Sequence, residues 1–251
     1  MTLTWIIAAS IAGGVLSVCA AALALVLRAA WIHSLVSYAI GALLGAAFLE
    51  VIPHAFEHGD SRSVAVSILG GILAFFLLEK LFLWRHSHDE HEAESAAHDH
   101  GRSGTLIMVG DTIHNFLDGI LIAAAFLQST QLGIIAALAI VAHEIPQEVG
   151  DFVILLNSGY SRARAFWVNV LSSVATLVGG VLGYYSLHAL EGWTPILLGI
   201  VAASMIYVAV ADLIPGLHRR PELGATASQT LLIGLGIGSI ALARVLVGDL
   251  H

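Results

Sequence analysis

Long apolar stretches alternate with short polar connections along the whole chain. Each stretch holds about 20 residues with few charges, the length that a helix needs to cross a hydrocarbon core of about 30 Å. Helices are expected because backbone groups that face lipid must form their hydrogen bonds within the segment. The pattern predicts eight membrane-spanning helices, at residues 4–27, 34–56, 64–84, 105–127, 131–156, 164–187, 194–214 and 229–247.

The composition is typical of an integral membrane protein. Apolar residues make up 58% of the chain and charged residues 11%, whereas soluble domains carry roughly 25% charged residues. The single cysteine, Cys19, excludes a disulfide scaffold and a cysteine zinc finger. Ten Lys and Arg residues are too few for a nucleic-acid surface. The sequence therefore predicts an all-α polytopic membrane protein, one transmembrane domain over residues 1–251, with the lipid bilayer and not nucleic acid as its partner.

The basic residues set the expected orientation, because cytoplasmic connections carry an excess of Lys and Arg. If both termini face outward, the outer loops carry only Arg62, and Arg244 lies in the outer part of the last span. We therefore expect both termini outside and a location in a bacterial inner (plasma) membrane. The inner side then carries the other eight basic residues, Arg28, Lys80, Arg85, Arg102, Arg162, Arg164, Arg219 and Arg220.

A histidine-rich, acidic segment separates the third and fourth spans. Residues 85–104 show no apolar period, which predicts a disordered cytosolic loop. Weak, exchangeable metal binding and a solvating linker that binds metal only incidentally are about equally supported. The candidate accessory metal ligands of this loop are His86, His88, His91, His98 and His100.

The fourth and fifth spans contain carboxylates without a base. No Lys or Arg occurs between Ser103 and Ser161. A charged side chain at the centre of a bilayer costs roughly 2.5–3.5 kcal/mol even on lenient insertion scales. The compensating charge must therefore be a proton, an Arg from another span or a bound cation, and intramembrane ionisable groups typically mark ion pathways. The carboxylates are Asp111, Asp118, Glu144, Glu148 and Asp151.

The spacing of the polar residues favours a metal ion. His114 and Asp118 are four residues apart, so they stack on one face of a helix. In the fifth span, the side chains form two neighbouring stripes, one with His143, Gln147 and Asp151 and the other with Glu144 and Glu148. Two antiparallel helices of this kind form a cage of imidazole and carboxylate ligands, which suits Zn²⁺, Fe²⁺ and Mn²⁺.

Two segments carry a family resemblance. His114-Asn115-Phe116-Leu117-Asp118-Gly119, followed by His143-Glu144-Ile145-Pro146-Gln147-Glu148-Val149-Gly150-Asp151, resembles the paired fourth-span and fifth-span signatures of the ZIP (Zrt/Irt-like) divalent-metal transporters. The resemblance implies a transporter that carries zinc, or Fe²⁺, Mn²⁺ or Cd²⁺, into the cytosol. It does not imply an enzyme. It also implies a 3+2+3 arrangement, in which spans 1–3 and 6–8 are inverted repeats around spans 4 and 5. The resemblance leaves open whether the protein is a monomer or a homodimer.

The resemblance further implies two adjoining metal positions. The primary position falls on His114, Asp118, His143 and Gln147, and the second on Asn115, Asp118, Glu144 and Gln147. Many family members have His or Glu at the place of Gln147, so this chain departs from the pattern at the bridging ligand. Further candidate accessory ligands are Glu148 and Asp151, and also Glu50 and His54, which are four residues apart near the outer end of the second span.

Two other functions compete with metal uptake by alternating access. An intramembrane zinc protease would need His-Glu-x-x-His, with both histidines on one helix face, but Gln147 takes the place of the second histidine. A proton- or sodium-coupled carrier of another solute could work with carboxylates alone. The two imidazoles of His114 and His143 favour a transition metal over such a solute.

Overall fold

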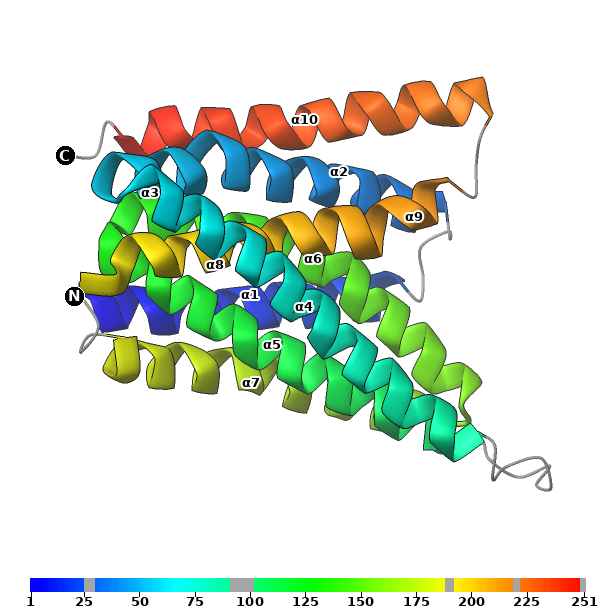
Figure 1. Ribbon diagram of the computed structural model, residues 1–251. Helices are drawn as coiled ribbons and strands as arrows, with labels where there is room; N and C mark the ends of the chain where they lie inside the picture. The colour runs from blue at the N-terminus through cyan, green and yellow to red at the C-terminus, as the bar shows by residue number, and fades with distance from the viewer. Residues whose placement is uncertain (25–29, 91–101, 188–191, 219–221, 249–251) are drawn as a thin grey trace.

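Helices form every regular element in the residues that the structure describes. The computed structural model describes residues 1–24, 30–90, 102–187, 192–218 and 222–248. Its helices join into eight rods over these residues, which lie roughly along one direction (Figure 1). Six rods are single helices: α1 (Thr2–Ala24), α4 (Ser61–Glu90), α5 (Arg102–Gln128), α6 (Thr130–Asn157), α7 (Arg162–Leu187) and α10 (Leu223–Gly248).

The other two rods each contain a π-helical turn. In one, α2 (Ala30–Ala46) continues through the turn η1 (Ala47–Val51) into α3 (Ile52–His58). In the other, α8 (Thr194–Tyr207) continues through η3 (Val208–Leu213) into α9 (Ile214–Leu217). A proline follows each π turn at the start of the next helix, Pro53 and Pro215. Because a π turn spans five residues, it changes which side chains share a face before and after it.

The structure confirms the all-α fold. Each of the eight predicted stretches corresponds to one rod. Among the described residues, seven rods are long and apolar enough to cross a membrane, and α5 is not among them. Helix α5 carries Asp111, His114, Asn115 and Asp118 within its length, which lowers its hydropathy.

Local hydrogen bonds fix where two of the helices begin. Asp60 precedes α4 and accepts the backbone N–H of Ser63 at 2.9 Å, which also lowers the pKa of this exposed carboxyl. Ser129 precedes α6 and accepts the backbone N–H of Leu132 at 3.0 Å. Both are N-cap interactions, which satisfy an N–H group that has no partner within the helix.

The described parts of α4 and α5 extend into the segment that the sequence predicts as a loop. The loop was expected at residues 85–104, but α4 continues to Glu90 and α5 begins at Arg102. The end of an apolar stretch marks where the chain leaves hydrocarbon, and helical hydrogen bonds can continue beyond it. The side chains of His86 and His88, and all of residues 91–101, lie outside the described part of the chain.

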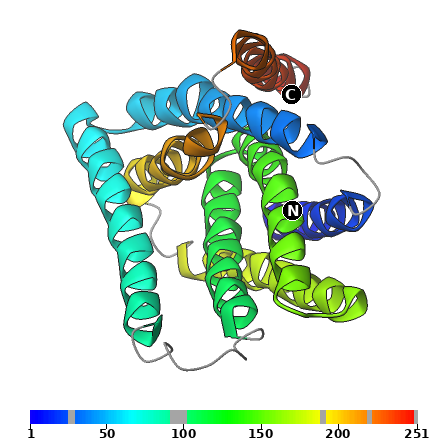
Figure 2. The same ribbon diagram turned by 90° about the vertical axis from the view of Figure 1, so that its right-hand side faces the viewer.

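The polar helices occupy the centre of the bundle. Seen along the rods, α5 and α6 lie side by side with the other helices around them (Figure 2). In the most apolar stretch of each helix, 67% of the residues of α6 are buried, against 11% for α4 and α10. On α4, the exposed side chains of Leu69, Leu73 and Leu77 repeat every four residues and form an apolar stripe. Lipid covers such a face, so the chain is an integral membrane protein with its polar residues inside.

Helices α5 and α7 approach each other through two glycines. A Cβ added to Gly119 would lie 2.0 Å from the carbonyl oxygen of Thr176, and one added to Gly179 would lie 2.0 Å from that of Phe116. Each glycine therefore contacts the backbone of the other helix. Small residues allow such contacts between helices in lipid. Because Gly119 directly follows Asp118, this contact also positions the polar face of α5.

We expect Gly179→Ala to destabilise the protein by forcing α5 and α7 apart. Overpacking of this kind costs about 1–3 kcal/mol, which corresponds to a fall in Tm of about 5 °C for a chain of this size. The measurement is thermal unfolding of the purified protein in detergent. Gly234→Ala is the matched control, since no atom lies within 4 Å of the added Cβ. Equal Tm values for both variants would contradict the close packing.

Candidate metal centre

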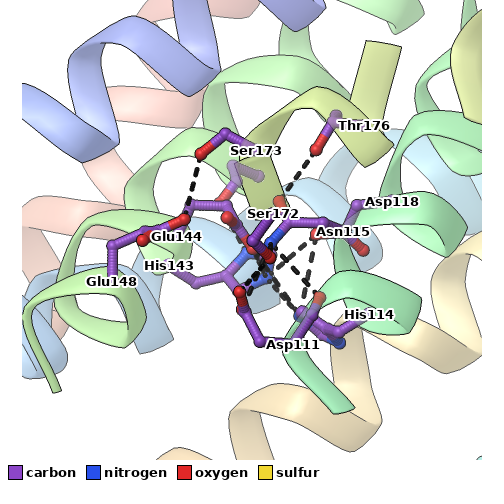
Figure 3. Close-up of polar contacts among 11 residues, drawn as sticks. Asp111, His114, Asn115, Asp118, His143, Glu144, Glu148, Ser172, Ser173 and Thr176 are labelled. Carbon is purple, nitrogen blue, oxygen red and sulfur yellow. Dashed lines mark hydrogen bonds and ion pairs between the residues drawn. The ribbon is translucent and has the colours of Figure 1, made fainter. Parts of the chain in front are cut away.

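Four side chains converge between α5 and α6. His114 and Asp118 come from α5, and His143 and Glu144 come from α6 (Figure 3). One ligand atom of each lies within 4.8 Å of the other three. We call these four residues the cage. It contains two imidazole nitrogens and two carboxylate oxygens, which are the ligand types that zinc takes together.

The distances within the cage match the ligands of a single ion. A tetrahedral zinc ion with bonds of about 2.0–2.1 Å separates its ligand atoms by about 3.3 Å. His143 Nε2 lies 3.2 Å from Asp118 Oδ2 and 3.2 Å from His114 Nε2. His114 Nε2 lies 3.7 Å from Asp118 Oδ2. Glu144 Oε1 lies 3.7 Å from Nε2 of His143 and 3.8 Å from Nε2 of His114. These five distances lie within about half an ångström of that value, and all four ligand atoms lie within 4.8 Å of one another.

The ring orientation of His143 directs a lone pair into the cage. Its Nδ1 lies 3.4 Å from the carbonyl oxygen of Ala139, one helical turn earlier. A carbonyl oxygen only accepts, so Nδ1 carries the proton and Nε2 has a free lone pair. Histidine ligands of metals usually donate their other ring N–H to a carbonyl or a carboxylate in this way.

Burial makes the cage carboxylates costly without a cation. Asp118 is 2% exposed and Glu144 is 6% exposed. Asp118 Oδ2 and Glu144 Oε1 accept no hydrogen bond from the described residues, and neither carboxylate pairs with a Lys or Arg there. A buried carboxylate needs a proton or a positive partner. The geometry and the charge thus point to the same occupant, a divalent cation.

Asn115 is not a member of the cage. Its side-chain Nδ2 donates to Asp111 Oδ1 at 3.1 Å, and its Oδ1 accepts from the hydroxyl of Thr176 at 2.8 Å. The hydroxyl of Ser172 donates to the other oxygen of Asp111. The bonds from Thr176 and Ser172 join α7 to α5 (Figure 3). Ser172 and Thr176 are small polar residues in an apolar span, and only their spacing of four residues, which places them on one face of α7, indicates a shared role.

Glu148 faces α7 and not the cage. It is fully buried, and its Oε1 accepts from the hydroxyl of Ser173 at 3.1 Å. The side-chain Nδ2 of Asn169 donates to the backbone carbonyl of Glu148 at 3.2 Å. Glu144 and Glu148, which the sequence predicts in one stripe, therefore have different partners. Glu144 lies in the cage, whereas Glu148 contacts α7.

A cavity of about 370 Å³ extends from the cage toward one end of the molecule. We call the end at which α1 begins and α10 ends the terminal end (Figure 1). The cavity lies toward the other half, because its residues come from the late parts of α6 and the α8–α9 rod, from the early part of α5 and from the middle of α4. Toward the terminal end, Ile122 and Ile140 beside the cage are buried. The polar residues that line the cavity are Glu79, Asp111, His114, Gln147, Asp151, Tyr207 and Asp212.

Glu50 and His54, two of the candidate accessory ligands, have different neighbours. Glu50 lies in the π turn η1 and pairs with Arg244 of α10 at 3.2 Å. Arg244 also donates to the carbonyl of Leu49 at 3.5 Å. His54 lies instead beside Glu57 and His58 at the end of α3. Because the π turn separates Glu50 from His54, the α-helical spacing rule fails there.

The chain is similar to known zinc transporters. It matches the family model described as ZIP zinc transporter over residues 2–104 and 83–244. It is 32% identical over 238 residues to zinc transporter ZIP13 of Pongo abelii, which covers 87% of this chain and 69% of that protein. It is 29% identical over 272 residues to ZIP13 of Homo sapiens, with coverage of 87% and 72%. It is 29% identical over 261 residues to zinc transporter zipt-7.2 of Caenorhabditis elegans, with coverage of 81% and 56%.

Proposed function

The chain belongs to the ZIP zinc transporter family, and we propose that it moves zinc across the membrane through the cage between α5 and α6. Proteins of this family are transporters, so the chain is not an enzyme. The observation that carries the proposed site is the convergence of four ligand atoms, two of them on buried carboxylates that pair with no Lys or Arg in the described part of the chain. The same donor set suits Fe²⁺, Mn²⁺ and Cd²⁺ as further cargo.

The two competing functions fit the geometry less well. A zinc protease uses the Glu of His-Glu-x-x-His to activate water, whereas Glu144 here is itself a member of the cage. A carrier of another solute would not need two imidazole nitrogens 3.2 Å apart. We therefore do not favour either alternative.

We propose that the protein works by alternating access. The cavity opens from the cage toward the end opposite the terminal end. If the termini face outward, as the distribution of Lys and Arg indicates, this cavity leads to the cytosol and the structure represents the inward-facing state. His114 lines both the cage and the cavity, which supports release of the ion past His114.

The matched relatives are animal proteins, so the bacterial inner membrane stays a prediction from the sequence alone.

Two inverted repeats would supply the motion. Glu50-Val51-Ile52-Pro53 and Asp212-Leu213-Ile214-Pro215 share the order carboxylate, two apolar residues and proline, and both overlap a π turn. The packing is also paired, because α10 lies on α2 as α4 lies on α8, and α1 lies on α6 as α7 lies on α5. These correspondences support the 3+2+3 arrangement with α5 and α6 in the middle.

The repeats suggest how the two states differ. Asp212 borders the open cavity, whereas its counterpart Glu50 is buried and pairs with Arg244. In transporters built from inverted repeats, one repeat rocks against the other around a fixed site, so opposite ends of the molecule open in turn. We propose that Glu50 becomes accessible, and that Asp212 becomes buried, in the outward-facing state.

The first prediction for transport concerns the cage. Asp118→Ala and His143→Ala should each reduce zinc uptake by about tenfold or more, since the loss of even an outer-shell partner of a metal ligand costs 10–100-fold. Uptake of radioactive zinc into proteoliposomes measures this effect. His218→Ala, at an exposed histidine away from the cage, serves as control. Normal uptake by both cage variants, with the protein correctly inserted, would show that the site lies elsewhere.

The second prediction concerns the number of ions at the cage. Asp118 and Glu144 supply two negative charges, so one divalent ion neutralises the cage, and a second would leave an excess charge in a low-dielectric interior. Asn115 is also engaged with Asp111 and Thr176. We expect one zinc peak at the cage in anomalous diffraction from crystals soaked with zinc. Gln147→Glu should add density at a second position, and two equal peaks in the parent protein would contradict the charge argument.

A further inference from the structure

A second cluster of metal-ligand side chains lies at the terminal end of the molecule. His54, Glu57 and His58 occupy the last turns of α3, which reaches the end where α1 begins (Figure 1). One ligand atom of each residue lies within 4.8 Å of the other two. His54 is half-buried, and Glu57 and His58 are exposed. The spacing of three and four residues places all three on one face of the helix.

The ring of His58 is oriented as a metal ligand. Its Nδ1 lies 2.9 Å from the carbonyl oxygen of His54, one turn earlier. Since a carbonyl only accepts, Nδ1 donates and Nε2 keeps its lone pair. His143 in the cage has the same arrangement with the carbonyl of Ala139. The rings of His54 and His58 are stacked, with their centroids 4.3 Å apart.

We propose that His54, Glu57 and His58 form a second zinc site, distinct from the cage, which captures the ion at the terminal end. Two imidazoles and one carboxylate select a zinc-type ion over Ca²⁺ or Mg²⁺, which take oxygen ligands. Three protein ligands leave a fourth position for water, as in zinc sites that exchange a ligand. The exposure of Glu57 and His58 allows the ion to enter and leave directly from solution. Only the capture role rests on the proposed function, because binding itself does not require transport.

Glu50 is not part of this second site. It lies four residues before His54, but Arg244 holds its carboxylate, and Arg244 supplies a positive charge there. The site therefore has one negative charge, from Glu57, against two in the cage. We expect zinc to bind more weakly at this site than in the cage, which suits an ion that must move on.

Zinc binding to the full-length protein in detergent tests the site. We would titrate zinc by calorimetry into the parent and into His54→Ala/His58→Ala, each with an intact cage and with His143→Ala. The double variant should bind one zinc ion fewer than its parent in both backgrounds, and excess Mg²⁺ should not compete. Phe56→Ala, on the same helix but without a ligand, is the matched control. Equal stoichiometry in double variant and parent would overturn the site.

Two further measurements control for misfolding of the double variant and test the capture role. Glu57→Gln changes only an exposed carboxylate, so it should fold normally and weaken the same binding step. Zinc uptake by the double variant should show a raised KM with an unchanged maximal rate. One lost ion with unchanged KM would overturn the capture role. A failure of the cage would appear separately, as normal uptake in His143→Ala.

Discussion

Two buried carboxylates, Asp118 and Glu144, constrain the rest of the structure, since neither pairs with a Lys or Arg among the described residues. Helices α5 and α6 carry these charges at a depth where water cannot stabilise them. The helices must therefore lie in the middle of the bundle, with their polar faces toward each other and apolar helices such as α4 and α10 toward lipid. The same constraint supports the proposed occupant, because a divalent cation would both neutralise the two charges and join the two helices.

The packing around α5 shows how that arrangement is held. Gly119 and Gly179 allow the backbones of α5 and α7 to touch, and this contact brings Ser172 and Thr176 to Asp111 and Asn115. Hydrogen bonds from α7 thus occupy the polar groups of α5 that do not belong to the cage. The side chains of His114 and Asp118, on the neighbouring face, stay available for a metal ion. Small residues and polar bridges are both ordinary means of joining helices in lipid.

The sequence predicts the features that depend on a single helix. Spans follow from hydropathy, and the pairing of His114 with Asp118 follows from spacing along α5. The positions of Asn115 and Glu148 could not be predicted, because each depends on how α7 packs. The ion pair of Glu50 with Arg244 joins residues far apart in the chain, so local spacing does not reveal it. Glu50 also lies in a π turn, where residues four apart do not share a face as they do in an α-helix. Spacing thus works within a continuous α-helix and fails at a π turn or between helices.

A transporter must release the ion that it binds, and the cage differs among its ligands in a way that allows this. The side chains of Asp118, His143 and Glu144 are nearly fully buried, whereas that of His114 is 24% exposed. His114 also borders the cavity, whose other polar residues include Asp111, Gln147 and Asp151. In the proposed mechanism, water and the side-chain oxygens of Gln147 and Asp151 would therefore replace the ligands of the ion from one side, beginning at His114. In the proposed site, the buried ligands would hold the ion in place, and the exposed one would set the direction in which it leaves.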